Sequence, residues 1–411
     1  MDITSRRLPR LPLGYFRARR SFPLLTLMIL LLFAVAACGT SPYIDAPHPR
    51  VTPTVPLDPQ LASETLYVIN ASPIAIAPSG WSLTALNAQT GAVRWKLPTA
   101  GMIGRPIVAN GDIYFAPQDG YVYAVDAATG HIRWRFQRTV NVSTRVGIDG
   151  YPALDGATLY VASDGGTVYA LDAQTGKERW LFTLPDSKGH IYAAPAVGRG
   201  KVYVSSGNGT NAFYALDEAT GKIAWQLSEP QGFDGYPLLE GNTVYVGADG
   251  YTRASFYALD ADTGKIRWQF QGNDSVITRP AFDGSNLFIG ALDSAQYQVN
   301  AESGKVGWHI TLTSSDNLPA LPTGAAPTIA DGVVYVGGES GVVEALDAAT
   351  GTLRWQRSVD GAVDSAPAVA DGAIYVTTEK GSVYALRARD GALAWLYADG
   401  GLIYASPVVA P

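Results

Sequence analysis

The sequence predicts an all-β protein: an eight-bladed β-propeller of four-stranded blades, closed by pairing of the C-terminal strand with the N-terminal blade. First, a pattern ending in Trp recurs with a period of 39 to 47 residues, which indicates a repeat architecture. Second, the segments around it, such as 158–162 and 167–171, are short, rich in Val and Tyr and apolar on both faces. Strands sandwiched between neighbouring sheets have this character, whereas helical repeats need apolar spacing over ten or more residues. The terminal tryptophans are Trp95, Trp134, Trp180, Trp225, Trp268, Trp308, Trp355 and Trp395.

Each repeat divides into four expected strands. A Pro-bearing strand comes first, and since proline cannot donate to a ladder, it belongs on an edge, here the innermost strand lining a central channel. Hairpin signals such as Asn110-Gly111 and Asp331-Gly332 follow. A Val/Tyr-rich second strand, a third strand ending at Asp and a fourth strand carrying Trp complete the unit. The prolines in register are Pro106, Pro152, Pro195, Pro237, Pro280, Pro327, Pro367 and Pro407.

The two ends of the repeat region predict how the ring closes. Residues 63–68 match the second strand of a repeat but have no Pro strand before them, and residues 405–409 form a Pro strand with no second strand after it. The C-terminal strand is therefore expected to complete the first blade. The ring would then close without a covalent link.

The Asp-x-x-Thr-Gly segment before Trp is expected to be a turn. Its carboxylate can accept from backbone amides about two residues on, and Gly supplies a positive φ. Each Trp then projects from the outer strand to dock neighbouring blades, and burying ~150–250 Å² at about 25 cal/mol/Å² contributes roughly 4–6 kcal/mol as an upper value. Asn87 and Asn300 replace Asp, and the last copy has Arg387 and Asp390-Gly391, so weaker turns or modified edges are expected there.

The pattern resembles the tryptophan-docking motif of PQQ-like β-propeller repeats, Ala-x-Asp-x-x-Thr-Gly-Lys-x-x-Trp. Its clearest copies are residues 170–180 and 258–268, and the resemblance covers nearly all of 61–411. It implies a quinoprotein-type fold and raises PQQ-dependent dehydrogenase as an activity. Those enzymes hold the quinone between a Trp and a ring of two adjacent Cys, beside calcium and a catalytic Asp. Here Cys38 is the single cysteine and Trp81 the one Trp outside the docking set, so no catalytic residue and no cofactor is expected.

Composition excludes further classes. The formal charge is −6, but residues 1–37 hold six Arg and one acid, which leaves a body of 24 basic and 35 acidic residues with a net charge of −11. Such a body repels phosphate backbones, so no nucleic-acid partner is expected. The four histidines, at 48, 131, 190 and 309, lack metal-ligand spacing, and no P-loop or EF-hand loop is present. No metal site is expected.

The N-terminus predicts export and lipidation. An Arg-rich start precedes a 14-residue apolar stretch, 24–37, which spans about 21 Å, short of the ~30 Å bilayer core. We interpret residues 1–37 as a signal peptide. Val35-Ala36-Ala37-Cys38-Gly39 resembles the lipobox of bacterial lipoproteins, which implies acylation of Cys38 and membrane attachment through the lipid alone. The alternative is a lone thiol after an ordinary cleaved signal. Residues 38–60, rich in Pro, are expected to be an extended tether to a propeller at 61–411.

Four residues preceding the register prolines are candidates for partner binding. If all eight such positions lie near the channel mouth, part of the ring is rich in Arg and Tyr and the rest is small. Arg and Tyr are frequent interface anchors, so a docking site for an acidic or peptide partner is one interpretation, and an ordinary polar rim is the other. The four candidates are Arg105, Tyr151, Tyr236 and Arg279.

The layout of lipobox, tether and eight-bladed propeller resembles the BamB-type family of outer-membrane-protein assembly lipoproteins. The resemblance implies a non-enzymatic scaffold that docks other envelope proteins, among them a β-barrel assembly machine, on the periplasmic face of an outer membrane. In a cell without that membrane, the outer face of the plasma membrane is expected, and a monomeric propeller in either case. Two alternatives stay open, a cell-surface ligand-binding or sensor propeller and a PQQ-dependent dehydrogenase, since fold alone does not fix function.

Overall fold

The computed structural model describes residues 56–71, 80–99, 101, 104–138, 152–163, 165–185, 189–191, 193–207, 211–229, 232–248, 255–272, 276, 278–291, 294–312 and 325–411. The predicted signal peptide, Cys38 and the predicted tether up to residue 55 lie outside the described residues, as does Tyr151. Within the described ranges, no helix is both long enough and apolar enough to cross a bilayer.

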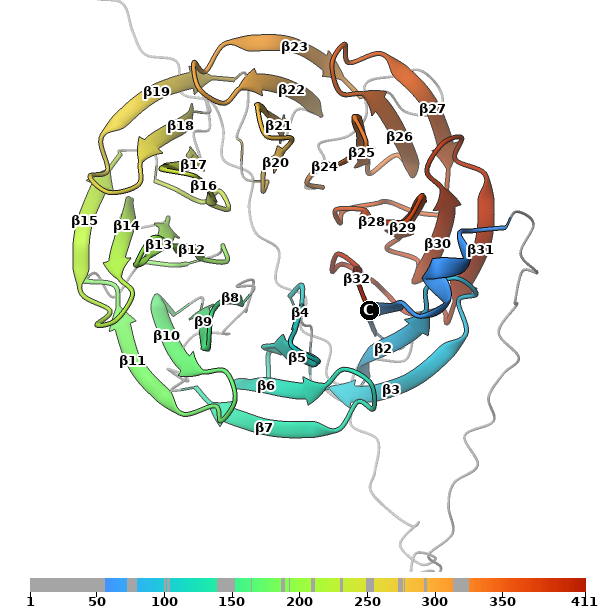
Figure 1. Cartoon of the computed structure of the whole chain (residues 1–411), viewed down its shortest axis with the longest axis horizontal. Helices are drawn as coiled ribbons and strands as arrows, with labels where there is room; N and C mark the ends of the chain where they lie inside the picture. The colour runs from blue at the N-terminus through green and yellow to red at the C-terminus, as the bar shows by residue number, and fades with distance from the viewer. Residues whose placement is uncertain are drawn as a thin grey trace, which may run out of the picture. The chain divides into compact units, whose positions relative to one another are not determined.

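The described residues form 32 strands in eight antiparallel sheets, which surround a common centre as the blades of a propeller (Figure 1). Blade 1 contains β32 (Val408–Ala410), β1 (Thr65–Ala71), β2 (Trp81–Asn87) and β3 (Val93–Thr99). Blade 2 contains β4 (Ile107–Ala109), β5 (Asp112–Phe115), β6 (Tyr121–Asp126) and β7 (Ile132–Gln137). Blade 3 contains β8 (Ala153–Asp155), β9 (Thr158–Ser163), β10 (Thr167–Asp172) and β11 (Glu178–Thr183). Blade 4 contains β12 (Ala196–Gly198), β13 (Lys201–Ser206), β14 (Ala212–Asp217) and β15 (Ile223–Ser228).

The second half of the ring repeats the same order from the inner to the outer strand. Blade 5 contains β16 (Leu238–Glu240), β17 (Thr243–Ala248), β18 (Ser255–Asp260) and β19 (Ile266–Gln271). Blade 6 contains β20 (Ala281–Phe282), β21 (Asn286–Gly290), β22 (Ala295–Asn300) and β23 (Val306–Thr311). Blade 7 contains β24 (Thr328–Ala330), β25 (Val333–Gly337), β26 (Val342–Asp347) and β27 (Leu353–Ser358). Blade 8 contains β28 (Ala368–Ala370), β29 (Ala373–Thr377), β30 (Ser382–Arg387) and β31 (Leu393–Ala398).

The innermost strand of each blade is short, and the register proline immediately precedes it, as Pro106 precedes β4. The proline therefore stands at the inner edge, where its missing N–H leaves no gap in the ladder. At the following turn of blade 2, Asn110 and Gly111 both have positive φ, 54° and 78°. Two such residues define a type I′ turn, whose twist matches that of the paired strands.

The third and fourth strands of every blade share one irregularity. In blade 3, Ala170 lies opposite Trp180, and the register shifts by one residue directly after this pair. The same pairing and shift occur in the other blades, with Gln298 in place of Ala opposite Trp308. A small residue opposite Trp leaves the indole room to turn toward the next blade, and the bulge re-aims the outer strand after the turn.

The predicted closure is confirmed. The C-terminal strand β32 pairs with β1, with Leu66 opposite Val409 and Tyr67 opposite Val408, and it lies in the same sheet as β2 and β3 (Figure 1). The buried cores form mostly between adjacent blades. One such core joins blade 8 to blade 1 through Trp395, Tyr375 and Leu66. The closure is therefore sealed by apolar packing as well as by the ladder.

A short 3-10 helix, η1 (Pro59–Ala62), precedes β1 and holds the start of the propeller against this seam. The side chain of Leu57 packs into the core around Trp395. Arg94 donates hydrogen bonds to the backbone oxygens of Ala62 and Glu64, at 2.9 and 3.0 Å. The last residues of the predicted tether are thus part of the folded body.

Candidate functional site

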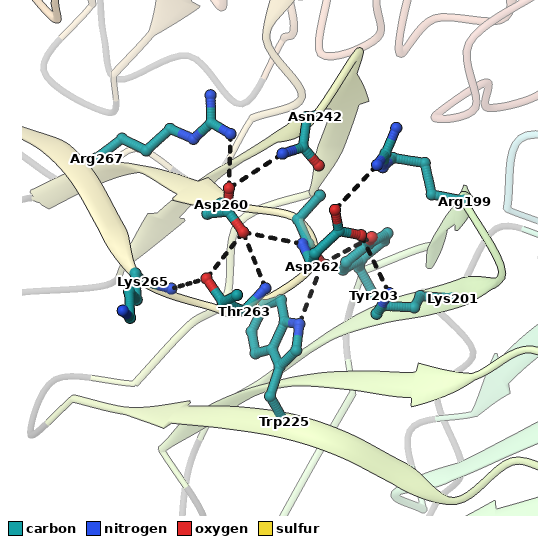
Figure 2. Close-up of polar contacts among 11 residues, drawn as sticks. Arg199, Lys201, Tyr203, Trp225, Asn242, Asp260, Asp262, Thr263, Lys265 and Arg267 are labelled. Atoms are coloured by element: carbon teal, nitrogen blue, oxygen red, sulfur yellow. Dashed lines mark hydrogen bonds and ion pairs between the residues drawn. The ribbon is translucent and has the colours of Figure 1, made fainter.

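The recurring motif is a docking device between blades, and the contact between blades 4 and 5 shows its parts (Figure 2). The indole Nε1 of Trp225 donates to the backbone oxygen of Ala261 in blade 5, at 3.1 Å. The hydroxyl of Tyr203 donates to the same oxygen, also at 3.1 Å. One carbonyl therefore receives the hydrogen bonds of both aromatic residues, while Arg199 and Lys201 of blade 4 pair with the Asp262 carboxylate of the same turn (Figure 2).

The acid of the motif organises the turn that presents this carbonyl. Asp260 Oδ1 accepts from the amide and the hydroxyl of Thr263, at 2.9 and 2.8 Å, while Oδ2 accepts from Arg267 and Asn242 (Figure 2). The hydrogen bonds from Arg267 and Thr263 lower the pKa of Asp260 to about 2. The Asp260 carboxylate is therefore ionised at neutral pH, and both of its oxygens are engaged by structural partners.

The motif glycine is required for two reasons, as Gly264 shows. Its φ is +71°, a conformation that other residues adopt only with strain. A Cβ on Gly264 would lie 2.6 Å from the Trp225 ring, because the indole lies directly on the glycine backbone. Each of the other seven motif glycines meets the docking Trp of the preceding blade in the same way.

All eight predicted docking tryptophans are at blade interfaces, and each Nε1 donates to a backbone oxygen of the next blade. Seven indoles are half-buried, whereas Trp395, covered by the segment that carries Leu57, is only 1% exposed. The acceptors, in the order of the tryptophans from Trp95 to Trp395, belong to Ala127, Ala173, Glu218, Ala261, Ala301, Ala348, Ala388 and Ala88.

The variant turns keep the shape of the motif. Asn87 and Asn300 accept with Oδ1 from Thr90 and Ser303, at distances close to those in the Asp turns. In the last copy, Arg387 instead donates to the Asp390 carboxylate. The expected weakening of the Asn turns is therefore not visible in their hydrogen bonding.

The second-strand tyrosine is a docking residue that the sequence pattern did not single out. Its hydroxyl shares the tryptophan's acceptor at several interfaces, and in blade 3 that of Tyr160 instead donates to Glu218 Oε1 at 3.1 Å. The signal for it is the recurring Tyr in the Val/Tyr-rich strand. The tyrosines that share an acceptor are Tyr67, Tyr203, Tyr245, Tyr335 and Tyr375.

The partner-binding candidates lie where the chain enters the inner strands, at the rim of one face of the ring. Arg105 belongs to blade 2, Tyr236 to blade 5 and Arg279 to blade 6, so they form an arc instead of one cluster. Arg105 and Tyr236 are half-buried, and Arg279 is exposed. Surrounding protein lowers the pKa of Arg279 although its side chain reaches solvent, and the Glu240 carboxylate partly opposes this.

Acidic side chains occupy the same face at blades 7 and 8, which the sequence pattern did not reveal. Asp364 lies in the connection from β27 to β28, and Glu379 lies in the loop from β29 to β30. Burial and a hydrogen bond with the Glu379 side chain raise the pKa of Asp364 to about 7. The amide of Glu379 donates to the Ala362 carbonyl at 3.0 Å, which ties the two loops together. The rim is therefore cationic and aromatic along one arc and acidic along another.

No group of three or more His, Cys, Asp or Glu side chains is arranged to hold a metal ion in the part of the chain that the structure describes. His131 and His309 stand beside docking-motif positions, with His309 stacked on Tyr297 at 5.9 Å between centroids.

Eight blades, each docked through an indole onto the backbone of the next, define the class: a PQQ-like propeller repeat protein. The sequence profile of the family described as outer membrane protein assembly factor BamB matches residues 54–209, 140–233, 213–326 and 298–408. The chain belongs to this family.

Individual relatives are more distant. Outer membrane protein assembly factor BamB of Escherichia coli is 39% identical over 67 residues, 15% of this chain and 17% of that protein. The chain thus matches about a sixth of this curated relative. The crystal structure of BamB from Moraxella catarrhalis has a TM-score of 0.58 at 18% identity and covers 80% of this chain and 95% of its own. The structure of a europium-containing methanol dehydrogenase has a TM-score of 0.64 at 17% identity, and the match covers 81% of this chain and 82% of the dehydrogenase. At these identities, the two structures show the fold alone.

Proposed function

We propose that this protein is a lipid-anchored, non-enzymatic scaffold of the cell envelope that binds other proteins, and that its specific role is in the assembly of outer-membrane proteins. The observation that carries the proposal is that the polar side chains of the repeated motif hold the blades together, while a separate set of basic and aromatic residues lies at the rim. The recurring Asp, Thr, Tyr and Trp side chains form the docking motif, whereas the rim residues Arg105, Tyr236 and Arg279 are not members of that repeated motif. Arg and Tyr on a rigid frame are the residue types that anchor protein interfaces.

Electrostatics supports a protein partner. The body of the chain has a net charge of −11, yet the rim on blades 2, 5 and 6 carries Arg105 and Arg279. Basic and aromatic residues on blades 2, 5 and 6 beside acidic residues on blades 7 and 8 favour one orientation of a docked partner. Membership in the BamB family supports a location in the cell envelope and, with it, a β-barrel assembly machine as the partner.

A redox enzyme is the main competing function, because PQQ dehydrogenases share the fold. The quinone clamp of those enzymes needs two adjacent cysteines, and this chain contains one cysteine, Cys38, next to its predicted signal peptide. Eight of the nine tryptophans dock blades. We expect no dye-linked dehydrogenase activity after reconstitution with PQQ and calcium.

The direct test is site-specific photo-crosslinking in the native membrane. A photoreactive phenylalanine replaces Arg279 in one variant and Lys265 in the control, since Lys265 precedes the outer strand at the opposite end of its blade. We expect the Arg279 position to crosslink a component of the β-barrel assembly machine and the Lys265 position to give no such product. Equal products from both positions, or none from Arg279, would contradict the proposed docking face.

A further inference from the structure

At several interfaces, the third-strand tyrosine of one blade is covered by a phenylalanine. Phe136 of blade 2 lies edge-on to Tyr169 of blade 3, with 5.6 Å between ring centroids. Phe182 covers Tyr214 in the same way at 5.7 Å, two residues after its docking Trp. The covered tyrosines are buried: Tyr169, Tyr214 and Tyr297 are covered by the phenylalanine two residues after the docking Trp, whereas at Tyr257 that position is Leu227 and Phe233, from the connection between β15 and β16, supplies the ring instead.

At the interface between blades 1 and 2, blade 1 has no phenylalanine, from the outer strand or from a connection, to cover the third-strand tyrosine of blade 2. Leu97 stands two residues after Trp95, where Phe136 and Phe182 stand in their blades, and the matching tyrosine, Tyr123, is half-buried. A groove of ≈ 280 Å³ lies here, lined by Leu97 and Pro98 on one side and by Tyr123 and Phe115 on the other. Phe115 and Tyr123 stack at 5.3 Å, so the wall is a pair of parallel rings. Phe115 is fully buried, so the part of this wall that stays uncovered is the half-buried ring of Tyr123.

Polar groups mark the groove. Asp119 is the charged residue of its lining, and it accepts from the Tyr123 hydroxyl at 2.7 Å and from the Tyr121 amide at 2.9 Å. Arg135 lies over the Tyr121 ring at 5.0 Å, beside this group. The hydroxyl of Thr99, also in the lining, is buried with no hydrogen-bond partner among the described residues. An occupant would therefore meet aromatic rings, one carboxylate and an unpaired hydroxyl.

We propose that this groove binds a segment of a partner protein that inserts an aromatic side chain next to a basic residue. The chain itself shows which group suits the aromatic surface, because a phenylalanine ring fills the equivalent place over Tyr169 and Tyr214. The Asp119 carboxylate and the net charge of −11 favour a positive neighbour for that ring. Backbone groups of the segment can pair with the buried Thr99 hydroxyl, whose isolation is costly.

The groove involves the outer strand β3 and the outer pair β6 and β7, whereas the rim candidates precede inner strands. The proposal therefore needs neither Arg279 and Tyr236, which belong to blades 6 and 5, nor a role in outer-membrane assembly. A failed crosslink at Arg279 would leave the groove untouched, and a failed peptide experiment would leave the rim untouched.

The test is fluorescence anisotropy of the full-length protein with a labelled nonapeptide, Gly-Ser-Thr-Val-Phe-Arg-Val-Thr-Gly. Comparison peptides carry Ala for Phe or Glu for Arg. We expect each replacement to weaken binding at least tenfold. Leu97→Phe, which supplies the missing ring from within, should weaken binding of the first peptide at least tenfold without lowering the melting temperature. Asp119→Asn should reduce the preference for Arg over Glu.

A matched variant tests the same logic in reverse. Phe136→Leu uncovers Tyr169 at the next interface and should add a second binding site for the Phe-Arg peptide. Equal binding of the Phe and Ala peptides, or unchanged binding by a folded Leu97→Phe variant, would overturn the proposal. Self-association that Leu97→Phe abolishes would also overturn it, since the occupant would then be a second copy of the chain.

Discussion

Truncating two docking tryptophans tests whether these residues hold the ring together. Trp180→Ala removes a half-buried indole that donates to the Glu218 carbonyl at 2.9 Å and lies against Gly221. Trp395→Ala removes the same group at the closure seam, where the indole is 1% exposed and packs with Leu57. The two variants differ mainly in how much apolar surface is lost.

The expected magnitudes follow from that difference. A fully buried Trp→Ala change costs about 3–5 kcal/mol, and an orphaned acceptor adds roughly 1 kcal/mol. Trp395→Ala should therefore lower the free energy of unfolding by about 5 kcal/mol. Trp180→Ala should cost about 3 kcal/mol, because part of its indole already faces water.

The assay is urea unfolding followed by far-UV circular dichroism, which does not depend on the removed fluorophore. Midpoint and slope are compared with those of the parent, because neighbouring blades can also unfold separately in repeat proteins. A loss below about 1 kcal/mol for Trp180→Ala would refute the docking role. So would a larger loss at Trp180 than at Trp395.

Four further outcomes are expected. Gly264→Ala should lower the free energy of unfolding by about 2 kcal/mol or more, because it combines a positive φ with a clash against the docking indole. Gly241→Ala, at φ +57° with open space around it, should lower it by about 1 kcal/mol. Equal losses of stability in urea unfolding would mean that the indole contact is unimportant. Cys38→Ala should release the protein from the membrane fraction, and retention on fractionation would argue against lipidation. Deleting residues 401–411 removes β32 and should lower the melting temperature, so an unchanged melting curve would contradict the closure. The pKa of Asp364 is raised to about 7, so the folded state binds the proton of this carboxyl more tightly than the unfolded chain does. The contribution of this group to stability is therefore full below about pH 4 and is lost as the pH rises through 7. Asp364→Asn should stabilise the protein at pH 8 and flatten the dependence of stability on pH, whereas an equal change in stability at all pH values would show that another group titrates.

The features that could be predicted from the sequence are those that repeat. Trp180 and its counterparts, the prolines before the inner strands and the pairing of β32 with β1 each follow from eight copies of one local pattern. A docking role for Tyr203 could have been suspected from the recurring Tyr of the second strand, but the sequence does not indicate that its hydroxyl bonds to a carbonyl of the next blade.

Features that depend on one interface could not be predicted. Asp364 and Glu379 meet because loops of successive blades stand side by side, and their shared environment has no counterpart in a linear motif. The half-buried ring of Tyr123 borders a groove because blade 1 has Leu97 at this interface and no phenylalanine. Arg105, Tyr236 and Arg279 precede inner strands of blades 2, 5 and 6, as their places in the repeats indicate, whereas the acidic residues on the same face could not be inferred from the motif.

The segment around η1 has a mechanical consequence. A pull on the chain from its N-terminal side reaches Leu57 before it reaches β1, and Leu57 is packed into the core shared by blades 8 and 1. The next contact along the chain is the hydrogen bond that the Arg94 side chain donates to the backbone oxygen of Ala62. Tension is thereby divided between the first and last blades before it can peel the three-residue pairing of β1 with β32. A force applied from the N-terminal side therefore has to disrupt the core shared by blades 8 and 1 before it acts on the pairing that closes the ring.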